Sequence, residues 1–123
     1  MNLRIEPMSE IPIYRQIASQ LKDMILSGTL AIDEPLPSSR NLAIELKVNM
    51  LTVQKAFKEL NEEELIYYRR GEGAFVSNIK NKSKKICQDE ITNQFRSSIQ
   101  KAILYGLNDK EIGALFERAR KES

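Results

Sequence analysis

The stretch SSRNLAIELKVNMLTVQKAFKEL, residues 38–60, decides the fold of this chain. Ser38 and Asn49 are residue types that cap helix N-termini, and each precedes apolar residues at helical spacing. The first stripe comprises Leu42, Ala43 and Leu46, and the second comprises Val53, Ala56, Phe57 and Leu60. Only residues 47–49 separate the two helices, and neither helix can bury its own stripe. The stretch therefore predicts a helix-turn-helix that packs on another helix.

The flanking segments complete a winged helix-turn-helix. Apolar residues recur with the helical period over residues 13–26, which predicts the first helix, and a proline-containing loop follows over residues 28–37. Residues 65–76, LIYYRRGEGAFV, predict two short strands around a glycine-rich turn. Three helices followed by a hairpin predict a DNA-binding domain of this type over residues 11–79.

The composition changes after the hairpin. Residues 77–85, SNIKNKSKK, are polar and basic and predict a linker. Two helical patterns follow, the second opened by a capping box that begins at Asn108. Two helices with one apolar stripe each do not make a self-sufficient domain, so we expect residues 80–123 to be a helical linker and dimerisation tail. The predicted dimer contacts are Ile91, Phe95, Ile99, Ile103, Ile112, Leu115 and Phe116. The expected fold class is thus mainly α with a small β-hairpin wing.

Composition excludes several classes of protein. The 123 residues include no histidine and a single cysteine, Cys87, which argues against disulfide frameworks, Cys/His metal sites and histidine-based catalysis. We expect no enzyme activity, no metal and no cofactor. Neither a signal peptide nor a membrane-spanning stretch is evident, so the expected location is cytoplasmic, with no membrane partner. Residues 1–78 hold nine basic and eleven acidic residues, so DNA binding there requires a local basic cluster.

The exposed side of the second helix follows from its buried stripe. A rotation of 100° per residue points Leu51, Lys55 and Lys58 away from the core, with Thr52 and Gln54 flanking them. In helix-turn-helix proteins, the N-terminal residues of this helix meet base edges in the major groove. We therefore predict that these residues bind DNA, Lys58 nearer a phosphate than a base. The alternative is that Leu51 packs into the turn and the lysines form a solvated face.

A phosphate contact is predicted at the start of the preceding helix. Ser38 and Ser39 present hydroxyls and backbone N–H groups at its positive end, and Arg40 lies on its outward side. The alternative is a capping serine beside an ordinary surface arginine.

A second contact is predicted in the hairpin. Arg69 and Arg70 precede Gly71 and Gly73, whose backbone can approach a sugar-phosphate ridge or enter the minor groove. Glu72 at the tip is acidic, which does not favour a close contact with DNA. The alternative is that Glu72 is an ordinary solvated turn residue and that the wing contacts the DNA only weakly.

Residues 12–76 resemble the winged-helix domain of the GntR family of bacterial transcription regulators. The matching motifs are IYRQI at 13–17, LPSSR at 36–40, V-N-x-x-T-V at 48–53 and RRGEGAFV at 69–76. The resemblance implies operator binding as a dimer. The DNA contacts that it implies are Arg40, Thr52, the neighbouring positions at the start of the recognition helix, which include Asn49, and Arg70 with Gly71 and Gly73. The short tail is similar to the YtrA-like branch, whose members lack the large effector-binding domain and often regulate membrane transporter genes.

The chain departs from this pattern at four positions. Similar proteins commonly carry other residue types where Met50 and Leu51 stand, a glycine where Glu64 stands and a basic residue at Glu72. The predicted function is a DNA-binding regulator, a repressor, that binds an inverted repeat of double-stranded DNA as a homodimer. The sequence leaves a small-molecule effector unknown, because the tail is too small to enclose a pocket of the usual ~300 Å³ unless the dimer interface supplies one. The alternative is a winged helix for protein association with little DNA affinity.

Overall fold

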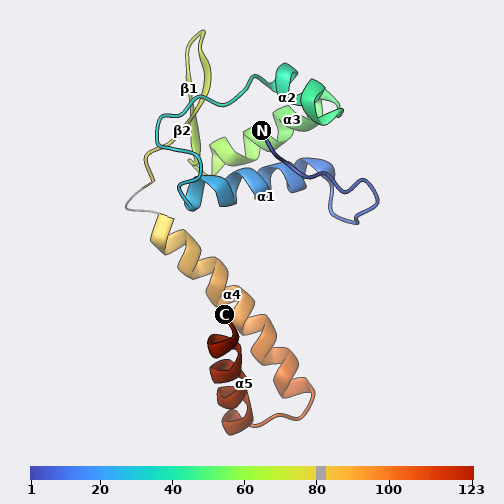
Figure 1. The fold of residues 1–123 in the computed structure, drawn as a ribbon, viewed down its shortest axis with the longest axis vertical. Coiled ribbons are helices and arrows are strands. Elements are labelled where there is room, and N and C mark those ends of the chain that lie inside the picture. Colours follow the sequence, from blue (N-terminus) through green and yellow to red (C-terminus); the bar gives the residue numbers. More distant parts are fainter. Residues whose placement is uncertain (80–82) are drawn as a thin grey trace. The chain divides into compact units, whose positions relative to one another are not determined.

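A computed structural model describes the chain apart from residues 80–82. It divides into two compact units, Met1–Lys80 and Asn81–Ser123 (Figure 1). The linker expected over residues 77–85 lies partly outside the described residues.

The three helices predicted for the first part are confirmed. They are α1 (Ile13–Leu26), α2 (Ser39–Leu46) and α3 (Met50–Glu62). The Ser38 hydroxyl oxygen accepts a hydrogen bond from the Asn41 N–H at 3.1 Å, and the Asn49 side-chain oxygen accepts one from the Leu51 N–H at 2.8 Å. Between them, Lys47 ends α2 in the left-handed conformation, at φ 58°. These caps and this turn make the tight break between α2 and α3.

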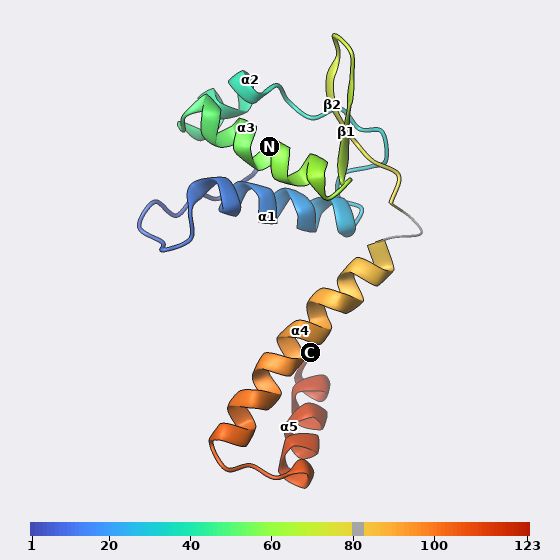
Figure 2. The same ribbon diagram turned by 180° about the vertical axis from the view of Figure 1, so that it is seen from behind.

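The core of the first unit lies where the buried stripes of its helices meet the hairpin. Figures 1 and 2 show α1 and α3 side by side, and α2 packs on α3. The largest fully buried side chains are Ile17, Leu21, Leu42, Leu60, Leu65, Ile66, Val53 and Val76. Burial of each such side chain contributes about 1.5–3 kcal/mol to folding. The stripe of α3 is therefore fixed inward, and the opposite side of the helix faces outward.

The predicted hairpin is confirmed and consists of β1 (Ile66–Arg69) and β2 (Gly73–Val76). The strands are antiparallel, with Ile66 opposite Val76 and Arg69 opposite Gly73. The Glu72 N–H donates to the Arg69 carbonyl at 3.0 Å, and Gly71 sits at φ 77° in the third position of that turn. A positive φ at this position favours glycine, as in type II turns.

The loop expected over residues 28–37 also pairs with the hairpin, which the sequence patterns did not indicate. The Asp33 N–H donates to the Val76 carbonyl at 2.8 Å, and the Leu36 N–H donates to the Ala74 carbonyl at 2.9 Å. In this way residues 33–36 lie along β2, with Pro35 opposite Phe75, and connect the wing to the body of the domain.

An N-terminal arm, residues 1–11, packs on α1 and was likewise unexpected. The side-chain oxygen of Gln16 accepts from the Glu6 N–H at 2.8 Å, and that of Gln20 accepts from the Arg4 N–H at 2.9 Å. Each amide nitrogen donates back to the carbonyl of the same arm residue. The two glutamines share a face of α1 because they are four residues apart.

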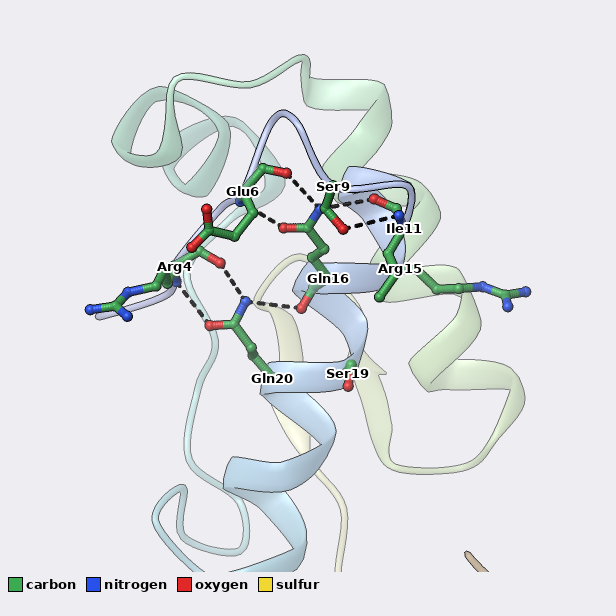
Figure 3. Close-up of a pocket in the computed structure, with 8 residues that line it drawn as sticks. All are labelled: Arg4, Glu6, Ser9, Ile11, Arg15, Gln16, Ser19 and Gln20. Carbon is green, nitrogen blue, oxygen red and sulfur yellow. Dashed lines mark hydrogen bonds between the residues drawn. The ribbon is translucent and has the colours of Figure 1, made fainter. Parts of the chain in front are cut away.

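A hollow of about 600 Å³ lies between the arm and α1 (Figure 3). Both glutamine amides beside it are committed to the arm backbone, and Arg4 and Arg15 point away from each other. We interpret this hollow as a gap left where the arm packs on α1, and not as a ligand site.

The second unit contains α4 (Ser83–Leu104) and α5 (Asp109–Glu122). Gly106, at φ 88°, ends α4 in a Schellman motif, with the Leu107 N–H donating to the Ala102 carbonyl at 3.0 Å. The predicted capping box is confirmed, since Asn108 and Glu111 exchange side-chain to backbone hydrogen bonds of 3.1 and 2.9 Å. Among the described residues, no helix is both long and apolar enough for a bilayer.

Candidate nucleic-acid interface

The outward side of α3 brings together the residues predicted to read DNA. Leu51 is 67% exposed, and Gln54, Lys55 and Lys58 are also exposed, whereas Thr52 is half-buried. Because the buried stripe takes the other side of the helix, these five side chains line one continuous surface of α3. A large apolar residue in this position contacts solvent unless a partner covers it.

Lys55 is held by an aromatic ring of α1. Its Nζ lies 4.1 Å from the centroid of the Tyr14 ring, well within the range of a cation–π interaction. Lys58, Glu59 and Glu62 line a small hollow of about 220 Å³ with this pair. Glu59 and Glu62 offset part of the lysine charge on this side of α3.

The start of α2 presents a cap and a free cation. The Ser38 hydroxyl oxygen is engaged in capping, which leaves its hydrogen available to a phosphate, and Ser39 is half-buried. Arg40 is exposed and, among the described residues, makes no hydrogen bond or ion pair. Asn49 caps α3 through its side-chain oxygen, which leaves its side-chain N–H groups available to donate to DNA.

The two hairpin arginines have different surroundings. The Arg69 guanidinium carbon lies 4.1 Å from the Phe75 ring centroid, and its Nη2 donates to the Tyr67 hydroxyl oxygen at 2.9 Å. That hydroxyl donates in turn to Asp33 Oδ1 at 2.6 Å, a hydrogen bond that raises the pKa of Tyr67. Arg70 is exposed at the start of the turn and makes no such contact within the part of the chain that the structure describes. Gly71 and Gly73, both at positive φ, expose the backbone beside it.

The apolar stripe of the second unit is exposed in the single chain. Phe95 and Phe116 are each 52% exposed although their rings meet edge to face, with centroids 6.4 Å apart. The remaining residues of the predicted dimer contact are exposed too, except for the half-buried Ile112. Because α5 buries no residue, this helix pair leaves most of its apolar surface in water.

Comparison with known proteins gives a consistent result. Residues 13–76 match the family model described as "Bacterial regulatory proteins, gntR family". The chain is 43% identical over 75 residues to the HTH-type transcriptional repressor YtrA of Bacillus subtilis (strain 168), a match that spans 61% of this chain and 58% of YtrA. A solved GntR family transcriptional regulator from Listeria monocytogenes aligns with a TM-score of 0.78 and 32% identity, covering 89% of this chain and 96% of that one. The DNA-binding domain of AraR, solved in complex with operator ORX1, aligns with a TM-score of 0.55 and 28% identity, covering 63% of this chain and 99% of that one.

Proposed function

We propose, from the premise that this chain belongs to the GntR family of bacterial regulatory proteins, that it is a repressor which binds an inverted-repeat operator as a homodimer. DNA-binding transcriptional regulation of the GntR type is what the family and its repressor relatives support directly. Repression, the form of the operator and the dimer are the additional steps of the proposal. Because regulators of operator DNA work beside the chromosome, the proposal includes a cytoplasmic location.

The observation that carries the proposal is the outward side of α3. It presents Thr52, Gln54 and Lys55 at the N-terminal end of a helix whose opposite side is fixed in the core. Glutamine pairs bidentately with adenine, lysine with guanine, and a threonine methyl contacts that of thymine. Lys58 and Arg40 supply cations to the phosphates on either side. Because the first unit has more acidic than basic residues, its binding to DNA depends on this local set of cations.

The dimer is proposed from the apolar stripe of the second unit. A second copy of the same helix pair presents the same stripe, so a two-fold arrangement covers both at once. A protein with this symmetry binds two half-sites related by the same axis, which is an inverted repeat. Following the resemblance to the YtrA-like branch, we propose that the controlled genes include membrane transporter genes.

Binding to random duplex DNA at several salt concentrations tests the proposal. If the protein contacts several phosphates, the logarithm of the binding constant falls linearly with the logarithm of salt concentration, by ~0.9 per phosphate neutralised. Arg40→Ala and Lys58→Ala should each reduce that slope by about 1. Lys22→Ala is the matched control, because it removes the same charge from a lysine that pairs with Glu63 at 3.2 Å.

Weak binding that hardly depends on salt would contradict the proposal. It would instead favour a winged helix that associates with another protein, with the exposed Leu51 as part of its contact surface.

A further inference from the structure

We propose that Asp33, Tyr67 and Arg69 form a brace that holds the wing in position, so that Arg69 is a positioning residue and Arg70 is the wing arginine that contacts DNA. The inference rests on the proposed function and concerns how the same surface is presented. The sequence predicted a DNA contact for both arginines, and the proposal gives the two different roles.

The brace is a continuous chain of contacts across the hairpin. Tyr67 and Phe75 are directly opposite each other in the register, and their rings stack with centroids 5.8 Å apart. Arg69 lies two residues beyond Tyr67 and therefore on the same face of β1. Its guanidinium rests on the Phe75 ring at 4.1 Å and donates to the Tyr67 hydroxyl at 2.9 Å. Although Arg69 is exposed, these contacts favour a guanidinium that lies against the hairpin over one that extends toward a phosphate.

The far end of the brace is anchored in the body of the domain. Asp33 accepts the Tyr67 hydroxyl hydrogen at 2.6 Å, and its own N–H donates to the Val76 carbonyl at 2.8 Å. Buried Leu30 and Leu36, on either side of Asp33, fix this loop in the core. The carboxylate thus links a core-anchored loop to the strand that leads to the wing tip.

The backbone conformation of Asp33 supports a specific role for its side chain as the acceptor for Tyr67. It adopts φ 64°, a left-handed conformation that favours glycine, although aspartate tolerates it better than most residues. Glycine would fit this position without strain but would leave the Tyr67 hydroxyl without its acceptor. Asp33→Gly therefore separates the stability of the loop from the integrity of the brace.

The experiment uses the full chain, with random duplex DNA as the probe, and combines binding at several salt concentrations with amide hydrogen exchange at the hairpin tip. Tyr67→Phe removes one hydroxyl and both of its hydrogen bonds. We expect faster exchange of the Glu72 amide, a salt slope equal to that of wild type and an affinity lower by about 2- to 12-fold, the equivalent of one ordinary hydrogen bond. Arg69→Ala should behave in the same way. Arg70→Ala, the matched control, should instead reduce the slope by about 1 and leave the exchange unchanged.

Asp33→Gly should lower DNA affinity and speed amide exchange while its thermal midpoint stays near that of wild type. If Asp33 only stabilised the fold, DNA affinity would fall only when the thermal midpoint falls. A reduced slope in Arg69→Ala, with Tyr67→Phe equal to wild type, would overturn the proposal, because Arg69 would then itself contact DNA. If the wild-type protein binds no duplex, the proposed function fails. In that case hydrogen exchange alone decides whether the brace holds the hairpin, and unchanged exchange in Tyr67→Phe overturns it.

Discussion

Truncation of Phe95 to alanine should separate the two copies of the proposed dimer. Phe95 is 52% exposed in the single chain, and a phenylalanine of the usual 150–250 Å² then leaves about 100 Å² for the partner to cover. At ~25 cal/mol per Å², and with some loss because alanine keeps the Cβ, this contact contributes about 2 kcal/mol in each copy. Two-fold symmetry counts the loss twice, so the dimer should weaken by ~4 kcal/mol, or about a thousandfold in Kd.

Sedimentation equilibrium over a range of concentrations measures this Kd directly. Leu104→Ala is the matched control, because Leu104 is 79% exposed on α4 but lies about 100° around the helix from Ile103 at the end of the stripe. Circular dichroism should show the same helix content in both variants. The reasoning is refuted if Phe95→Ala dimerises as tightly as wild type, or if the wild-type protein is a monomer at micromolar concentration.

Three further results are expected. Tyr14→Leu removes the aromatic ring beside Lys55 and should lower DNA affinity by about 2- to 5-fold, the equivalent of 0.5–1 kcal/mol. Tyr14→Phe keeps a ring at this position and should have the affinity of wild type. Strict additivity of Tyr14→Leu and Lys55→Ala in a double-mutant cycle would show that the two residues are not coupled. Glu64→Gly should raise the free energy of unfolding by ~0.5–1 kcal/mol, because Glu64 adopts φ 61°, and a lower thermal midpoint in this variant would contradict that explanation. The hydrogen bond to Asp33 raises the pKa of Tyr67, so the stability it adds is complete below the usual value of about 10 and is lost as the pH rises through the raised value. The tyrosinate absorbance that is present in wild type and missing in Tyr67→Phe should therefore appear above the usual pH of about 10, and a difference titration centred at or below that pH would contradict the assignment.

Local features of this fold could be predicted from the sequence. Ser38, Asn49 and Asn108 are caps whose chemistry acts within three residues, and the stripe that ends at Leu60 follows from the period of the helix. The glycine that the family resemblance implies at position 64 also has a physical reason, because the backbone of Glu64 is left-handed. Such features depend on neighbours in the sequence, so a single sequence contains the necessary information.

Contacts between distant segments could not be predicted in the same way. Asp33 and Tyr67 are 34 residues apart, and nothing in either local pattern indicates that they meet. The same applies to the contact between Tyr14 and Lys55. It also applies to Gln16, which in the sequence is an ordinary polar residue of an amphipathic helix and in the structure binds the N-terminal arm. The sequence patterns therefore predicted the candidate surface, whereas only the tertiary structure showed which residues contact its side chains.

Selection of bound sequences from random duplex DNA tests the central claim most directly. If a two-fold dimer presents the N-terminal end of α3 to the major groove, the enriched sites should be an inverted repeat whose half-sites are about one helical turn, or a whole number of turns, apart. Enrichment of an isolated half-site or a direct repeat, or no enrichment at all, would contradict the account.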